Sequence, residues 1–144
     1  MATRNFQALN NGKQFLFKFH RLHDFLGSLN YIINNRLNIS ILWIYGSGYP
    51  VSLPIEKYAA QRGGEILYIP ELNNYQMPAY HRLDAGIHYQ LTNKKIKQNL
   101  SFDIYNVYNR KNAVNMYFGG YKYKSLNSAV LIPIIPSISY TLKF

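Results

Sequence analysis

The sequence predicts an all-β fold built from about five long antiparallel strands. Apolar residues recur at every second position in four segments, each segment is about ten residues long, and turn-forming residues separate the segments. Strands of globular sheets usually have about five or six residues, whereas roughly 9 to 11 are needed to cross a bilayer at a tilt. The pattern therefore favours strands that span a membrane as part of a β-barrel.

The five expected strands follow a short lead-in of residues 1–21, which we interpret as the remnant of an extracellular loop. Residues 22–144 are expected to hold the strands, placed approximately at 22–33, 37–47, 80–91, 98–108 and 130–144. The first strand is the weakest, because its alternation is the least regular. In the last strand, Pro133 and Pro136 lack a backbone donor and predict a bulge or a late start to the pairing.

The expected connections are short at one end of the sheet and long at the other. Asn34-Asn35-Arg36 is predicted to form a tight turn, since Asn tolerates a left-handed backbone, and residues 92–97 form the next turn. Residues 46–79 and 109–127 are expected to be long loops. This asymmetry is typical of outer-membrane barrels, which have short periplasmic turns and long extracellular loops.

The composition agrees with a surface that faces something other than water. Aromatic residues make up 16% of the chain, with 14 Tyr, while Asp and Glu number only 6. Barrels in membranes need amphipathic rings at both interfaces. The net charge of +10 could indicate nucleic-acid binding, but the densest basic groups fall in predicted turns. We therefore favour solvated turn ends, or contacts to anionic lipid headgroups, and expect no nucleic acid as a partner.

Several other classes of protein are excluded or disfavoured. There is no cysteine, and there is no run of 18 apolar residues that could form a transmembrane helix. Met1 to Gly12 does not read as a signal peptide, so an export signal is expected elsewhere in a larger protein. No nucleophile elbow, phosphate-binding Gly-rich loop or paired carboxylates are present, so we expect neither an enzyme nor a cofactor. We expect no metal site at His20, His23 and His81, because no Cys and no carboxylate cluster accompanies them.

Two sets of strand residues are candidates for function. Arg82, Asp84, His88 and Asp103 are expected to face the lumen of a barrel, where they either contact cargo or a plug or, as we favour, form a satisfied ladder of polar side chains. Aromatic residues on the apolar faces predict a belt at the membrane interface, with a sandwich core as the alternative. The belt candidates are Tyr31, Trp43, Tyr45 and Tyr89.

Aromatic residues in the long loops form a third set. Exposed rings in long loops suit ligand capture, although they could equally pack loop against loop. The candidates are Tyr58, Tyr68, Tyr75, Tyr117 and Tyr121.

Four local patterns, in this order and spacing, resemble the C-terminal barrel region of TonB-dependent outer-membrane receptors of Gram-negative bacteria. They are Tyr45-Gly46-Ser47-Gly48-Tyr49-Pro50; Met77-Pro78-Ala79-Tyr80-His81-Arg82-Leu83-Asp84; Phe102 to Asn112, with its Asn-rich exit; and Ile135 to Phe144, with its terminal Phe. The resemblance covers about residues 15–144. It implies five C-terminal strands of a barrel of roughly 22 strands that encloses a plug.

The resemblance also implies a function and a set of partners. Receptors of this family import scarce nutrients such as iron chelates, vitamins or glycans, driven by a periplasmic energy-transducing protein. In the family, the barrel-assembly machinery reads a terminal aromatic with apolar residues at alternate positions, here Tyr140, Leu142 and Phe144. The expected partners are thus the rest of the barrel and plug, that machinery, the energy-transducing protein and outer-membrane lipid. The alternatives are a soluble basic β-domain that binds carbohydrate or nucleic acid, and a non-functional receptor fragment.

Overall fold

The computed structural model describes residues 3–4, 12–60, 63–92, 96–119 and 125–143. Within these ranges the chain forms strands that pair antiparallel, and it forms no helix. The prediction of an all-β antiparallel fold is therefore confirmed, although the described strands make open sheets and not a closed barrel. No helix in the described part of the chain is long and apolar enough to cross a membrane.

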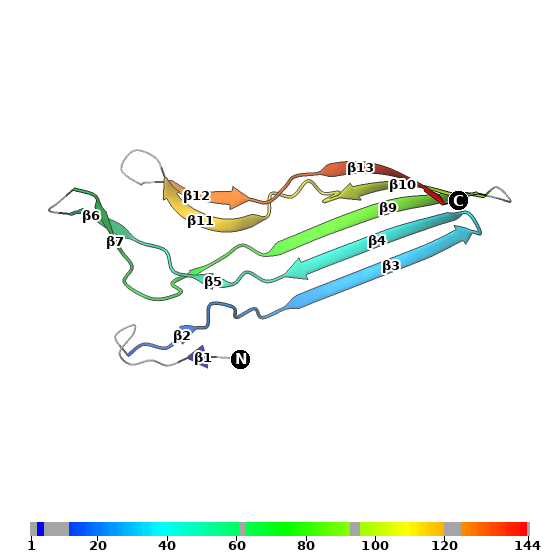
Figure 1. The fold of residues 1–144 in the computed structure, drawn as a ribbon. Coiled ribbons are helices and arrows are strands. Elements are labelled where there is room, and N and C mark those ends of the chain that lie inside the picture. Colours follow the sequence, from blue (N-terminus) through cyan, green and yellow to red (C-terminus); the bar gives the residue numbers. More distant parts are fainter. Residues whose placement is uncertain (1–2, 5–11, 61–62, 93–95, 120–124, 144) are drawn as a thin grey trace. The chain divides into compact units, whose positions relative to one another are not determined.

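The largest sheet has five strands, in the order β13-β10-β9-β4-β3 (Figure 1). Its members are β3 (Asp24–Asn34), β4 (Leu37–Gly46), β9 (Tyr80–Thr92), β10 (Lys97–Tyr105) and β13 (Ile135–Lys143). Each strand pairs antiparallel with the next one of the five along the chain. The sheet is therefore a meander, with β3 and β13 at its two edges.

Two of these strands end or begin three or more residues away from the place that the sequence predicted. The fourth strand ends at Tyr105 and not at residue 108, because Asn106 has a φ of 56° and breaks the extended backbone. The last strand begins at Ile135 and not at residue 130, which fits the predicted late start at the prolines. No bulge interrupts its pairing, since Pro136 lies in register with Ile104.

The turn between β3 and β4 lies where it was predicted, but its mechanism is different. Neither Asn34 nor Asn35 has a positive φ. Instead, the Asn34 side-chain Oδ1 accepts hydrogen bonds from the backbone N–H groups of Arg36, at 2.9 Å, and Leu37, at 3.0 Å. The turn is therefore held by an Asx cap and not by a left-handed asparagine.

The register of the sheet gathers alternate residues into two faces of different chemistry. We call one of them the apolar face, because among its members only Gly27, Asn34, His81 and Gln98 are not apolar. Its members are Phe25, Gly27, Leu29, Tyr31 and, after a register shift, Asn34 of β3; Leu37, Ile39, Ile41, Trp43 and Tyr45 of β4; His81, Leu83, Ala85, Ile87, Tyr89 and Leu91 of β9; Gln98, Leu100, Phe102 and Ile104 of β10; and Pro136, Ile138, Tyr140 and Leu142 of β13.

The opposite side, which we call the polar face, holds every Asp, Lys and Arg side chain of the five strands. These residues are Asp24, Arg82, Asp84, Lys97, Asp103 and Lys143. Ser, Thr, Asn, Gln and His fill most of the remaining positions, while β3 and β4 also place Leu26, Ile32, Leu42 and Ile44 there. Charge is thus confined to one side of the sheet.

A second unit of the fold contains the segments that connect the long strands and precede them. Its short strands pair as β1 (Thr3–Arg4) with β2 (Phe15–Leu16), β5 (Pro50–Val51) with β8 (Tyr75–Gln76), β6 (Glu56–Ala59) with β7 (Glu65–Tyr68), and β11 (Ala113–Gly119) with β12 (Ser125–Val130). The expected loops 46–79 and 109–127 therefore contain hairpins of their own, which the sequence reading missed.

The buried apolar side chains of the described residues lie in this second unit and not in the five-stranded sheet. Leu53 and Met77 are nearly inaccessible, and so is Pro50. Asn74 fixes the segment around Leu53, because its side-chain amide exchanges two hydrogen bonds with the Leu53 backbone, at 2.8 and 2.9 Å. Gly48 is required nearby, since a Cβ atom there would overlap the backbone carbonyl of Met77.

Candidate functional site

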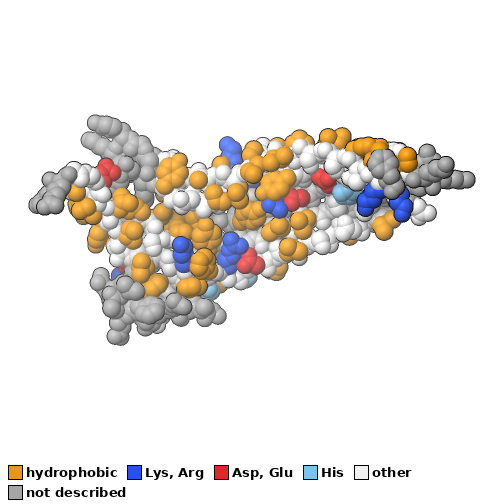
Figure 2. Space-filling model, in the orientation of Figure 1, with side chains coloured by type: hydrophobic (Ala, Val, Ile, Leu, Met, Phe, Trp, Pro, Cys, Tyr) orange, Lys and Arg blue, Asp and Glu red, His pale blue; other side chains and the backbone are white. Residues whose placement is uncertain are grey.

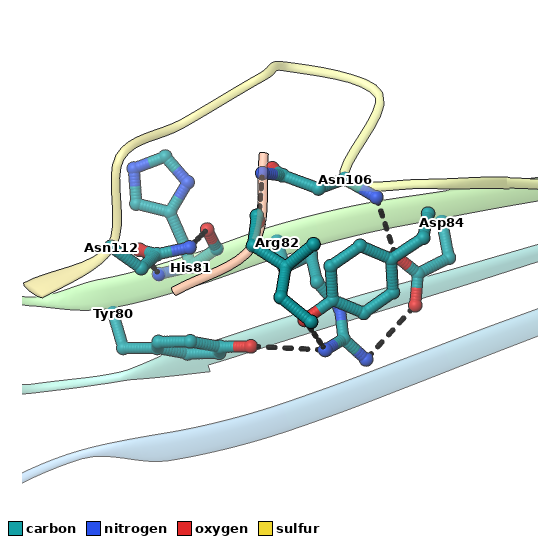
Figure 3. A network of polar contacts seen from close by, with 8 residues as sticks. Tyr80, His81, Arg82, Asp84, Asn106 and Asn112 are labelled. Carbon is teal, nitrogen blue, oxygen red and sulfur yellow. Dashed lines mark hydrogen bonds and ion pairs between the residues drawn. The ribbon is translucent and has the colours of Figure 1, made fainter. Parts of the chain in front are cut away.

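The polar face carries a network centred on Arg82, at the end of the sheet where the long connections leave (Figure 3). Arg82 Nη1 donates to the hydroxyls of Tyr80, at 3.1 Å, and Tyr105, at 2.7 Å. Arg82 Nη2 forms an ion pair with Asp84 Oδ2 at 2.9 Å, and both side chains are largely shielded from solvent. The guanidinium also stacks over the Tyr105 ring, 4.1 Å from its centroid. Arg82 therefore links β9 to β10.

Asn106 connects this network to the chain that leaves β10. Its side chain is 1% exposed, and its backbone N–H donates to Asp84 Oδ1 at 2.9 Å. Its side-chain amide accepts from Arg110 N at 3.2 Å and donates to the carbonyls of Arg110, at 3.1 Å, and Ile132, at 3.4 Å. Both carboxylate oxygens of Asp84 are thus engaged, and the segment before β13 is tied to the end of β10.

Asn112 ties the chain that follows β10 to the start of β9. Its side-chain amide donates to the His81 carbonyl at 2.9 Å and accepts from the His81 N–H at 3.1 Å, so it imitates a neighbouring strand (Figure 3). Sequence reasoning noted an Asn-rich exit here but assigned no role to Asn106 or Asn112. The available signal was the clustering of Asn directly after a strand, where its tolerance of left-handed backbone and its side-chain amide are both useful.

A second polar cluster lies farther along the same face, over Gly86. His88 Nε2 lies 3.0 Å from Ser40 Oγ, and His88 Nδ1 lies 3.0 Å from Ser101 Oγ, so the ring bridges β4, β9 and β10. Asp103 Oδ1 approaches His88 Nε2 to 3.6 Å. A Cβ atom on Gly86 would overlap the Asp103 carboxylate and crowd Ser40 Oγ. The glycine therefore makes room for the cluster.

The four residues proposed to face the lumen thus lie on one face, in two separate groups. Arg82 pairs with Asp84, and His88 lies beside Asp103. Their polar atoms are mostly satisfied by one another and by neighbouring hydroxyls, although Arg82 Nε is buried without a hydrogen-bond partner. That these residues line a lumen stays a prediction.

The four belt candidates lie on the apolar face. Trp43 stacks on Tyr45, with ring centroids 6.0 Å apart, and Tyr45 continues to Phe25 at 6.1 Å and to His81 at 6.5 Å. This aromatic group lies at the end of the sheet that carries the long connections. Tyr89 and Tyr140 lie near the other end and flank Leu100 in one cross-strand row, and Tyr31 lies nearby, 62% exposed.

The candidate loop tyrosines lie in different hairpins of the connecting unit. Tyr58 of β6 and Tyr68 of β7 contact each other edge to face, at 6.1 Å, and both are exposed. The Tyr58 hydroxyl donates to the Glu56 carboxylate, which raises the pKa of Tyr58. Tyr75 is half-buried in β8 and Tyr117 is exposed in β11, while Tyr121 lies outside the described residues.

Two residues of the expected assembly signal can be located. Tyr140 and Leu142 both lie on the apolar face of β13, whose outer edge has no partner among the described strands. Phe144 falls outside the described residues. The assembly role stays a prediction, which the outer-membrane level of a receptor lacking Phe144 would test.

Comparisons with known proteins do not assign the chain to a family. No family model, curated protein or solved structure matches it. Within the described residues, no group of three His, Cys, Asp or Glu side chains is placed to hold a metal ion.

The buried amide of Asn106 should stabilise the fold more than its backbone conformation alone explains. Asn106 and Asn109 both have a positive φ, of 56° and 52°. Replacing either by Ala removes an Asn suited to that backbone, but only Asn106→Ala also removes a buried, fully bonded amide. We expect Asn106→Ala to lower the free energy of unfolding by about 1–3 kcal/mol more than Asn109→Ala, in urea titrations in detergent micelles. Equal losses would contradict the role given to Asn106.

Proposed function

We propose that residues 24–143 form part of the wall of a transport barrel in the outer membrane, with the apolar face toward lipid and the polar face toward the lumen. The observation that carries this proposal is the separation of charge. Every Asp, Lys and Arg of the five long strands lies on one face, and the opposite face is a broad apolar surface. An exposed apolar patch of this extent needs a partner surface or a membrane.

The aromatic residues support the choice of a membrane. On β4, Tyr45 lies eight residues from Leu37, which shares a cross-strand row with Tyr89. At about 3.4 Å per residue these two levels are roughly 27 Å apart along the strand, and Leu, Ile, Phe and Ala fill much of the interval. At the strand tilt of about 35–45° that outer-membrane barrels have, this length corresponds to roughly 20 Å along the membrane normal. Such barrels have an apolar band about 25 Å tall between two aromatic girdles, so the spacing supports a membrane-facing band.

The connections support the orientation. At one end of the sheet, β3 reaches β4 through Asn35 and Arg36 alone, and residues 93–96 join β9 to β10. At the other end, 33 residues separate Gly46 from Tyr80, and 29 separate Tyr105 from Ile135. Short turns on the periplasmic side and long loops outside are typical of such barrels.

The strand directions specify what must complete the wall. In the meander, β3 and β13 run in the same direction, because an odd number of antiparallel strands lies between and including them. An all-antiparallel barrel therefore needs an odd number of additional strands between these edges. Copies of this sheet in one orientation would meet with parallel edges, so we expect the other strands to come from different sequence. An open edge in lipid would leave backbone groups unsatisfied, at several kcal/mol each.

In a membrane, the apolar face should not tolerate a charged side chain, whereas the polar face should tolerate one. Ile138 and Ser139 are neighbours on β13, and their side chains point to opposite faces. We expect Ile138→Lys to reduce insertion into phosphatidylcholine vesicles, measured by protease protection, by about 2–4 kcal/mol, because the lysine enters the hydrocarbon. Ser139→Lys is the matched control and should change insertion little. Equal insertion of the two variants would contradict the assignment of the apolar face to lipid.

The transport function rests on the four patterns that resemble the receptor family and on the polar surface available to line a lumen. We propose the import of a scarce nutrient, such as an iron chelate, a vitamin or a glycan, driven by a periplasmic energy-transducing protein. A strain lacking the gene should lose uptake of one such radiolabelled nutrient when it is scarce. In the parent strain, collapsing the proton gradient should abolish the same uptake. Unchanged uptake across all three nutrient classes in the deletion strain would contradict an import role.

A further inference from the structure

Adjacent strands bring a serine, a histidine and an aspartate together on the polar face. Ser101 of β10 lies directly opposite His88 of β9 in the register. Asp103 lies directly opposite Gly86, two residues from Ser101 on the same face. His88 Nδ1 is 3.0 Å from Ser101 Oγ, and His88 Nε2 is 3.6 Å from Asp103 Oδ1. The same three residue types, linked in the same order, activate the nucleophile of serine hydrolases.

The Asp103 carboxylate decides which nitrogen of the His88 ring carries the proton. A neutral imidazole has one donor and one acceptor nitrogen, and an ionised carboxylate can only accept. Asp103 therefore favours a proton on Nε2, where the Ser40 hydroxyl, at 3.0 Å, can accept as well. Nδ1 is then the acceptor, and it receives the hydroxyl proton of Ser101. Ser101 is thus bonded to a base, as a nucleophilic serine must be.

The position of Gly86 fits a site that needs close approach. Glycine weakens the interior of a strand, and it often marks a place where another group comes near the backbone. A Cβ atom on Gly86 would overlap the Asp103 carboxylate and lie 3.1 Å from His88 Nε2. The missing side chain therefore lets the carboxylate reach the ring.

A hollow beside Ser101 offers room for a substrate. It has a volume of about 560 Å³, and its lining includes Ser101, His88 and the side-chain amides of Asn38, Gln90 and Asn99. Asn99 is two residues from Ser101 on the same face and lies in register with Gln90. Amide N–H groups can hold the negative oxygen that forms when a serine attacks a carbonyl. The hollow thus places donors next to the nucleophile.

The cluster can be reached from solvent. The side chains of His88 and Asp103 are 37% and 43% exposed, and Figure 2 shows acidic and histidine side chains side by side at the surface. Water, which the last step of a hydrolysis consumes, can therefore enter. Both residues lie on the face opposite to the apolar one, so a water-soluble ester with a short acyl group suits the site better than a lipid ester.

We propose that Ser101 is the nucleophile of an esterase, with His88 as its general base and Asp103 as the positioning residue. This activity goes beyond the proposed transport and does not depend on it. Ser101 Oγ bonds to the ester carbonyl carbon, its proton passes to His88 Nδ1, and the carbonyl electron pair moves onto oxygen. That pair then returns and expels the alcohol, which takes the proton from His88. Water attacks the acyl-serine in the same way, which releases the carboxylic acid and restores Ser101.

The sequence gives no local sign of this site, which explains why we expected no enzyme from it. Ser101 and Asp103 are separated by one residue, and neither lies in a nucleophile elbow. His88 meets them only through the register between β9 and β10. Such a site is recognised by its geometry and not by the spacing of its residues along the chain.

The test uses the full chain in detergent micelles and a fluorescent fluorophosphonate, which phosphorylates an activated serine with release of fluoride. Mass spectrometry should locate the label on Ser101, and the chain should hydrolyse p-nitrophenyl acetate. Ser101→Ala should lose the label and lower kcat/KM by more than roughly 100-fold. The matched control is Ser139→Ala, which removes the serine directly opposite Ser101 on the same face and should change neither result.

A second variant separates catalysis from folding. His88→Ala should lower kcat/KM by more than roughly 100-fold, and added imidazole should restore hydrolysis at least in part, because it supplies the missing base. A merely structural role of His88 would give no such rescue. The proposal would be overturned by a parent chain that takes no label, by a label on another serine, or by equal hydrolysis in the parent and Ser101→Ala.

Discussion

The cross-strand register of the five long strands is the constraint on which the other features depend. Side chains alternate between faces with a period of two, so a slip of one residue in any strand would move its polar side chains to the apolar side. The polar face helps to prevent such a slip. Arg82 and Tyr105 join β9 to β10, and His88 joins both of these strands to β4. The side-chain hydrogen bonds of the polar face thus fix the register that holds the apolar face together.

The sheet has an apolar surface but no core of its own. Among the described residues, the nearly inaccessible apolar side chains lie in the connecting unit, while Ile138 on β13 is 74% exposed. Removing apolar area from water is the main favourable contribution to folding, so this face needs an apolar environment from outside the sheet. In the proposed barrel, a membrane would supply it for the face, and further strands would supply hydrogen bonds for the edges. The two requirements together favour a barrel over an isolated domain.

The long strands could be predicted from the sequence because a sheet with one apolar side requires apolar and polar residues to alternate along each strand. Leu83 to Leu91 and Leu100 to Ile104 show this pattern, and both segments lie within observed strands. The roles of Asn106 and Asn112 could not be predicted, since they depend on which distant backbone groups meet each amide. Arg82 and Asp84 were expected on one face, but their link to Tyr105 required the register between β9 and β10.

The short hairpins were missed for a different reason. The strands β6 and β7 have four residues each, too few to establish a period. The signal that was present is the pair Gly63 and Gly64, whose φ values of 81° and 104° serve the turn between them. The mechanism of the turn after β3 was mistaken because asparagine can act through its backbone or its side chain. The sequence alone does not distinguish the two.

The single tryptophan offers the most direct test of the lipid-facing surface. Trp43 is on the apolar face, 38% exposed, in the aromatic group that we assign to one membrane interface. With the chain inserted in vesicles, lipids brominated near the headgroup end of their acyl chains should quench Trp43 fluorescence more strongly than lipids brominated near the chain terminus. Emission typical of water, with no quenching by either lipid, would contradict the assignment of this face to the bilayer.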